Sequence, residues 1–101
     1  MPANYKPRIN SEKLERAAYV LKAMAHPTRI NIIDLLDQRD ELSVTEISGL
    51  LNCEQSLLSH HLSNMRDKGI LCVRRDGKNM YYSLKDSTIT KIISCINQSG
   101  F

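Results

Sequence analysis

The feature that most constrains the fold is a pair of closely spaced helix signals between residues 43 and 69. Residues 43–46 read Ser-Val-Thr-Glu, the S-x-x-E spacing of a capping box, in which two side chains satisfy free amide groups at a helix start. Asn52 follows the apolar positions of that helix and tolerates the left-handed backbone of a helix end. A second helix is expected over about residues 54–68, and Gly69 ends it. The sequence therefore predicts two helices joined by about three residues.

Two strand patterns follow this pair of helices, at residues 71–75 and 78–84. Asp76-Gly77 between them accepts the positive backbone angles of a two-residue hairpin turn. A turn at these two residues sets a register in which alternate side chains face the core and the solvent. The expected inward pairs are Val73 with Met80 and Leu71 with Tyr82, and the expected outward pairs are Cys72 with Tyr81 and Arg74 with Asn79.

Apolar residues at helical spacing predict three further helices. One begins at Ser11, and His26-Pro27-Thr28 separates it from a second that ends near Gln38, because proline suits the first turn of a new helix. The last begins after Asp86. Apolar positions on the first and last of these helices are Leu14, Ala17, Leu21, Ile89, Ile92, Ile93 and Ile96.

Together these elements predict a mainly α fold with a small β-hairpin, namely a winged helix-turn-helix with five helices and a two-stranded wing. At 101 residues the chain has the size of one domain. Residues 1–10 hold two prolines and little apolar pattern, so we expect a flexible N-terminal arm there and one folded domain over residues 11–101. With four Tyr, one Phe and no Trp, the core is thin enough to favour a partner subunit.

The composition argues against several classes of protein. Three cysteines are an odd number without a C-x-x-C pair, which disfavours a disulfide framework and a structural zinc site. The sequence has neither a signal peptide nor an apolar run of membrane-spanning length, so we expect a cytoplasmic protein without a membrane partner. Paired carboxylates, a glycine-rich phosphate loop and a Cys-His-Asn signature are missing at useful spacing, so the sequence does not predict an enzyme.

Basic residues gather beside a polar helix face. In residues 66–85, six basic residues and two acidic ones leave a net charge of +4, while the rest of the chain sums to −1. The side of the helix at residues 54–68 that faces away from its apolar positions carries short hydrogen-bonding side chains. This combination predicts binding to double-stranded DNA through base edges and backbone phosphates. The expected contact residues are Gln55, Ser56, Ser59, His60 and Ser63 on the helix and Arg74, Arg75 and Lys78 on the wing.

One alternative interpretation is a winged-helix module that binds another protein and has no DNA target, because a fold alone does not fix function. In that case the polar helix face is an ordinary solvated surface. Salt separates the two interpretations, because a DNA binder loses affinity steeply as salt is added and an apolar docking surface does not.

The histidines have mainly structural interpretations. His26 precedes a proline at a helix start, where capping or packing is more common than metal binding, and we expect the same of His61. Adjacent residues such as His60 and His61 project about 100° apart on a helix and do not readily chelate one ion.

The three cysteines divide into two groups. Cys53 and Cys95 are expected to be small buried hydrophobes. Cys72 is a redox candidate, because it is expected on the outer wing face near Arg74, where a cation would stabilise the thiolate. Oxidation there would disturb phosphate contacts, which makes a thiol-responsive repressor a further alternative.

Four stretches of the chain resemble the ArsR/SmtB-type winged-helix transcriptional repressors. They are LKAMAHPTR at residues 21–29, ELSVTEI at 41–47, QSLLSHHL at 55–62 and the wing at 74–82, and the likeness covers roughly residues 14–96. The resemblance implies a homodimer whose first and last helices pack across a twofold axis. It also implies that each recognition helix enters a major groove of a palindromic operator and that an inducer releases the repressor.

The chain departs from that family at its best-known inducer sites. Where metal-sensing members have a Cys-x-Cys pair in the third helix, this chain has Ser43 and Thr45, which are not soft metal ligands. The second common site uses histidines where this chain has Thr88 and Ser99. We therefore expect no bound metal, no cofactor and an inducer of another kind. Glu54 stands where a helix-start serine is usual, and we expect it to cap the helix but repel DNA phosphate.

Overall fold

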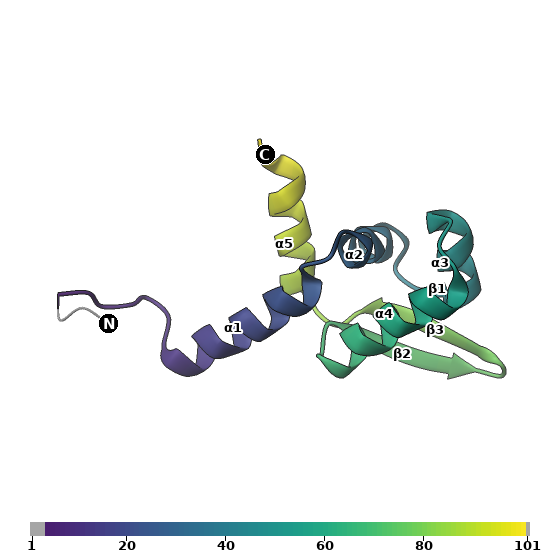
Figure 1. Cartoon of the computed structure of the whole chain (residues 1–101), viewed down its shortest axis with the longest axis horizontal. Helices are drawn as coiled ribbons and strands as arrows, with labels where there is room; N and C mark the ends of the chain where they lie inside the picture. The colour runs from purple at the N-terminus through teal and green to yellow at the C-terminus, as the bar shows by residue number, and fades with distance from the viewer. Residues whose placement is uncertain (1–3, 101) are drawn as a thin grey trace.

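The computed structural model describes residues 4–100 and shows five helices and a three-stranded sheet in that range (Figure 1). This architecture confirms the predicted winged helix-turn-helix. The helices are α1 (Ser11–Met24), α2 (Pro27–Arg39), α3 (Val44–Leu51), α4 (Gln55–Asp67) and α5 (Ser87–Gln98), and the strands are β1 (Leu42–Ser43), β2 (Leu71–Asp76) and β3 (Asn79–Leu84).

The two ends of the predicted domain organisation are only partly described. Residues 1–3 of the expected arm and residue 101 of the expected domain lie outside the described residues. Residues 4–10 are exposed and form neither helix nor strand. The folded part begins at α1, where the Asn10 side chain accepts the amide N–H of Lys13 at 2.8 Å and caps the helix.

Side-chain caps fix the helix starts where the sequence predicts them. The Glu46 amide donates to Ser43 Oγ at 3.1 Å, and the Ser43 amide donates to the Glu46 carboxylate at 2.9 Å, which completes the reciprocal capping box of α3. Asn52 ends α3 with a left-handed φ of 51°. The ring of His26 caps α2, because its Nδ1 accepts the amide N–H of Thr28 at 3.1 Å. The predicted capping role of this histidine is confirmed.

The hairpin forms as expected, but its register differs from the prediction. The two turn residues are Gly77 and Lys78, not Asp76 and Gly77. Gly77 has a φ of 61°, and a turn with a positive φ at its first central residue favours glycine there. The pairing therefore shifts by two residues, which keeps every predicted inward and outward face. The observed pairs include Leu71 with Leu84, Cys72 with Ser83, Val73 with Tyr82 and Arg74 with Tyr81.

β1 is a strand that the sequence pattern does not predict, so the two-stranded wing is extended to three strands. Leu42 pairs with Tyr82 and Ser43 with Tyr81, and the strand order is β1-β3-β2. A two-residue strand is too short to show alternation in sequence, and it exists because the fold brings it against β3. The pairing joins the wing to the start of α3.

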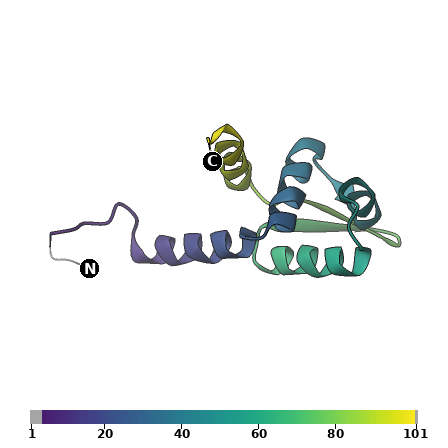
Figure 2. The same ribbon diagram turned by 45° about the horizontal axis from the view of Figure 1, so that its top comes forward.

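The core lies where α2 crosses α3, α4 and the sheet. Its fully buried side chains are Ile32, Ile33 and Leu36 of α2, Ile47 of α3, Leu58, Leu62 and Met65 of α4, and Ile70. In contrast, α1 extends away from this body (Figure 2), and only Ala23 and Met24 at its C-terminal end are buried. Among residues 4–100, every helix is too short or too polar to cross a membrane.

Candidate nucleic-acid interface

α4 presents a mainly polar face to solvent because three of its four apolar residues point into the core, whereas Leu57 is 51% exposed. Leu58, Leu62 and Met65 are completely buried. On the other side of the helix Gln55, Ser56, Ser59 and His60 are exposed and Ser63 is half-buried. The helix therefore brings together the five side chains that the sequence predicts as DNA contacts, on a surface that the rest of the described chain leaves open.

The start of α4 is arranged differently from the expectation. Glu54 occupies the N-cap position, but its side chain makes no capping hydrogen bond to the helix. Instead, the hydroxyl of Ser56 donates to the Glu54 carboxylate. The expected cap at Glu54 is therefore wrong, because the carboxylate satisfies a neighbouring hydroxyl rather than the free amides. The negative charge still lies at the end of the helix that a phosphate would approach.

On the wing, one of the three expected cations is held by the protein itself. The guanidinium of Arg74 donates two hydrogen bonds to the Glu41 carboxylate, at 2.7 and 3.1 Å, and lies 4.8 Å from the centre of the Tyr81 ring. These hydrogen bonds lower the pKa of Glu41 below its ordinary 4.5 and raise that of Arg74. Arg75 and Lys78 are exposed, and neither has an ion pair among residues 4–100. The positive charge available to DNA on the wing is therefore that of Arg75 and Lys78.

A polar cluster that the sequence does not predict lies behind α4, centred on Arg29 at the start of α2. Its Nε donates to His61 Nδ1 at 3.0 Å, and its Nη1 donates to Asn64 Oδ1 at 2.7 Å and to the Ala23 carbonyl at 3.0 Å. One guanidinium thus joins the C-terminal turn of α1, the start of α2 and the middle of α4. The only sequence signal for it is the position of Arg29 in the stretch LKAMAHPTR, which carries the family resemblance.

His61 is buried within this cluster, so the expected packing role is confirmed. Its ring lies 4.7 Å from the His26 ring. Burial lowers the pKa of His61 below its ordinary 6.5, and the nearby positive charge of Arg29, with His26 and His60, lowers it further. Because Nδ1 accepts a hydrogen bond from Arg29, the neutral ring carries its proton on Nε2.

The residues expected at a dimer interface fall into two groups. Leu14 and Leu21 on α1 are 44% and 50% exposed, and Ala17 between them is half-buried. Ile92 and Ile96 on α5 are half-buried. Ile89 and Ile93 are 4% and 5% exposed and belong to the core of the chain itself, and their assignment to the interface stays a prediction. They have little surface left for a partner, because α5 turns them onto α2 and the sheet.

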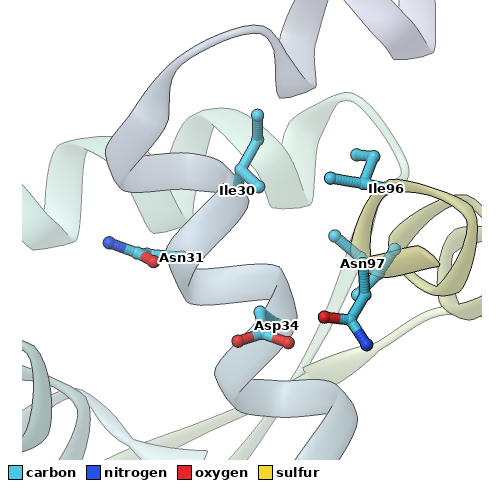
Figure 3. Close-up of a pocket in the computed structure, with 6 residues that line it drawn as sticks. Ile30, Asn31, Asp34, Ile96 and Asn97 are labelled. Atoms are coloured by element: carbon cyan, nitrogen blue, oxygen red, sulfur yellow. The ribbon is translucent and has the colours of Figure 1, made fainter. Parts of the chain in front are cut away.

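A small pocket of about 190 Å³ opens between α2 and α5 (Figure 3). Its walls are Ile30, Asn31 and Asp34 of α2 and Ile93, Ile96 and Asn97 of α5. The pocket is smaller than most ligand sites and holds one charged group, the Asp34 carboxylate. It adjoins the half-buried face of α5, and we therefore treat it as part of that surface.

The cysteines only partly follow the expectation. Cys72 is exposed on β2, as expected of the redox candidate, and it is paired across the hairpin with Ser83. Cys53 is half-buried against the core. Cys95 is exposed rather than buried, because it lies beside the isoleucines of α5 but on the outer side of the helix. Across residues 4–100, no group of three or more His, Cys, Asp or Glu side chains is placed to hold a metal ion.

Known proteins match the chain over most of its length. A sequence model described as "Bacterial regulatory protein, arsR family" matches residues 26–72. The transcriptional repressor PagR of Bacillus anthracis is 39% identical over 90 residues, which cover 89% of this chain and 90% of PagR. The crystal structure of PagR superimposes with a TM-score of 0.80 and covers 87% of this chain and 100% of that one.

Two further solved structures have the same fold. HlyU from Vibrio cholerae is 31% identical, with a TM-score of 0.81 and coverage of 88% of this chain and 96% of that chain. The homodimeric winged helix-turn-helix DNA-binding domain Mb0332 from Mycobacterium bovis is 25% identical, with a TM-score of 0.76 and coverage of 92% and 85%. With a polar recognition helix, a basic wing and these likenesses in sequence and fold, the chain belongs to the arsR family of bacterial regulatory proteins and is a winged-helix transcriptional regulator.

Proposed function

We propose that the protein is a homodimeric repressor that binds a palindromic operator through α4 and the wing, and that an inducer releases it. The observation that carries the proposal is the exposed row of short polar side chains on α4 next to two unpaired wing cations, Arg75 and Lys78. Polar side chains of this size reach base edges in a major groove, and the cations bind the phosphates beside it. These are the functions of a regulator and not of an enzyme.

Within this surface we assign different roles to different residues. Ser59 and His60 lie at the centre of the exposed face and read bases, while Gln55 and Ser56 position the helix on the DNA. Arg75 and Lys78 hold the backbone or the minor groove. Arg74 contributes less to DNA binding than the sequence suggests, because the Glu41 carboxylate already neutralises its charge.

The exposed leucines of α1 support the dimer. A soluble chain gains stability when Leu14 and Leu21 are covered, and the half-buried side of α5 offers further apolar surface. A twofold dimer presents two recognition helices with the symmetry of a palindrome. The related Mb0332 domain is homodimeric, which agrees with this assembly. Binding to DNA places the protein in the cytoplasm.

The inducer is not a metal at the usual family sites, because Ser43 and Thr45 are poor metal ligands and Ser43 is already part of the capping box. A second candidate is a thiol-responsive repressor, which the exposure of Cys72 on the wing favours. Mild peroxide should then lower DNA affinity in the native protein and leave Cys72→Ser unaffected. Equal behaviour of the two proteins under peroxide would remove Cys72 as the sensor.

The proposal is tested by fluorescence anisotropy on a duplex selected from a random pool and on a random-sequence duplex, across a series of salt concentrations. Affinity should fall steeply with salt, and Arg75→Ala should reduce the logarithmic salt slope by about one unit on both duplexes. His60→Ala should lower the preference for the selected duplex by about tenfold. Lys91→Ala on α5 is the matched control, because it removes one exposed charge from an element outside the wing and α4.

Three results would contradict this function or one of the residue roles assigned within it. An affinity that is nearly independent of salt would point to a protein-interaction module instead. Unchanged binding by Arg75→Ala at moderate salt would show that the wing does not hold the backbone. Equal losses by His60→Ala on the two duplexes would remove His60 from base reading.

A further inference from the structure

A second basic site lies between α1 and α4, and it is formed by residues other than those assigned to DNA. A pocket of about 350 Å³ opens there, within the size range of small-molecule sites. Three of its lining residues are cations, and none is acidic. They are Lys22, Arg29 and Lys68, with Tyr19, Ala23 and Asn64 completing the wall.

The cations of this junction are not neutralised by the protein. Across residues 4–100 the ion pairs involve Arg66 and Arg74 only, so Lys22, Arg29 and Lys68 have no carboxylate partner. Lys68 Nζ lies 4.8 Å from the centre of the Tyr19 ring, and the guanidinium of Arg16 lies 5.4 Å from it. Like charges collected at one place repel each other, and an anion among them removes that cost.

Arg29 also has hydrogen-bonding capacity to spare. Its Nε and Nη1 bind His61, Asn64 and the Ala23 carbonyl. Its Nη2 has no acceptor within residues 4–100, although a guanidinium carries two N–H groups there. A planar guanidinium with free donors in a cationic pocket suits an oxyanion, which accepts such bonds in pairs.

None of the residues that line the pocket is among those assigned to the dimer or to DNA. On α1, Tyr19 lies about 140° around the helix from Leu14, so it is on another side of the helix from the exposed leucines. On α4, Asn64 lies one turn beyond His60, about 40° around the helix from it, so the pocket borders the C-terminal end of the face assigned to DNA. The volume of the pocket suits a small anion, and a DNA phosphate is the alternative that the second test separates from it.

We propose that this pocket binds a small, multiply charged oxyanion of the organic phosphate or polycarboxylate class, and that such an anion is the inducer. The proposal rests on the proposed function. An anion that attracts Arg29 competes with the hydrogen bonds to His61 and Asn64 that hold α4 against the end of α1. Occupancy therefore changes the placement of the recognition helix relative to the helix that carries the exposed leucines.

The first test uses the full chain without DNA, so that it is independent of operator binding. Pyrophosphate and citrate are titrated into ¹⁵N-labelled protein at constant ionic strength, with sodium chloride as the balancing salt. We expect saturable shifts of the backbone amides of Tyr19, Lys22 and Lys68. Removing each charged donor should weaken binding about tenfold, which makes Lys22→Gln/Lys68→Gln the diagnostic variant. Lys13→Gln/Lys91→Gln is the control, because it removes the same charge at exposed positions elsewhere.

The second test adds the selected duplex. Pyrophosphate should weaken DNA binding by the native chain more than sodium chloride of equal ionic strength, and the Lys22/Lys68 variant should lose this excess. Absence of saturable shifts, or equal loss in both double variants, overturns the site. Saturable shifts without an effect on DNA overturn the inducer role. If the free anions do not bind but the Lys22/Lys68 variant loses DNA affinity on every sequence, the cations belong to the DNA interface and the proposal is wrong.

Discussion

α1 and α4 are amphipathic helices of similar length, 14 and 13 residues, yet the chain stabilises them in different ways. α4 buries four side chains along its length, Leu58, His61, Leu62 and Met65. α1 buries only Ala23 and Met24, both in its last turn. An isolated helix of this length is marginal in water, so most of α1 lacks stabilisation from its own chain. α4 is therefore held along its length by its own chain, whereas α1 leaves apolar side chains exposed that the proposed second subunit would cover.

The C-terminal end of α1 and the α4 helix are also joined by a polar link, in addition to the apolar core that both helices enter. Arg29 connects the Ala23 carbonyl at the end of α1 to His61 and Asn64 on α4. Polar contacts of this kind fix orientation more strictly than an apolar contact does, because hydrogen bonds are directional. One side chain therefore supplies the directional link between the helix with the exposed leucines and the helix assigned to DNA.

The largest effect is expected from removing a side chain that anchors α4. Leu62→Ala leaves a cavity at a completely buried position and should lower the free energy of unfolding by about 2 to 5 kcal/mol. Urea denaturation followed by circular dichroism measures the change. A loss below about 1 kcal/mol would show that α4 is less firmly part of the core than its burial indicates.

On α1 the same kind of truncation should act on assembly instead of on the folded chain. Leu14→Ala/Leu21→Ala removes apolar surface from two half-exposed leucines and should raise the dimer dissociation constant by about 30-fold, or about 2 kcal/mol. Sedimentation equilibrium measures it, with Glu15→Gln on another side of α1 as the control. A monomer at all concentrations in the native protein, or an unchanged dissociation constant, would contradict the comparison.

The polar link between the helices should tolerate no substitute for the guanidinium. Arg29→Lys keeps the charge but cannot direct three hydrogen bonds from one planar group, so we expect a loss of about 1 to 2 kcal/mol of stability. Urea denaturation of Arg29→Lys beside Arg29→Gln tests this. Full rescue by lysine would show that only the charge matters at this position.

The smallest effect is expected from pH. The pKa of His61 is lowered in the folded chain, so the unfolded chain binds the proton more tightly, and stability falls as pH drops below about 6.5. The decline continues until the pH passes the lowered pKa of the folded state. His61→Asn keeps an acceptor for Arg29 but does not titrate, so its unfolding free energy should lose this slope. If the unfolding free energies of the native chain and of His61→Asn change in parallel with pH, His61 is not the source of this slope.

Glu41 provides a separate check at more acidic pH. Its pKa is lowered by the hydrogen bonds from Arg74, so its contribution is present above about 4.5 and is lost as pH falls below that value. Protonation of either group therefore lowers the stability of the folded chain as the pH falls, but the two groups act in different pH ranges. If the native chain and His61→Asn both lose stability only at acidic pH, the loss must come from Glu41 and other carboxylates.

Much of the fold was predictable because its signals are local. The capping box at Ser43, the left-handed Asn52 and the His26 cap each depend on residues within four positions along the chain. The polar face of α4 follows from helical periodicity, which needs no knowledge of what covers the other side. For this reason the expected DNA-contact residues of α4 share one exposed or half-buried face.

What the tertiary structure decided are features that depend on segments far apart in sequence. β1 exists because it pairs with β3. Arg74 is neutralised because Glu41, 33 residues earlier in the sequence, lies next to it in the folded chain. Arg29 likewise donates a hydrogen bond to Asn64, which is 35 residues away in the sequence. The turn at Gly77 also depended on pairing along the whole hairpin, since two turn positions were compatible with the same faces. By itself the sequence determined which surfaces are polar and where helices begin, because these follow from neighbours along the chain. Only the folded chain decided which charges remain free, because that depends on the partners the fold brings close.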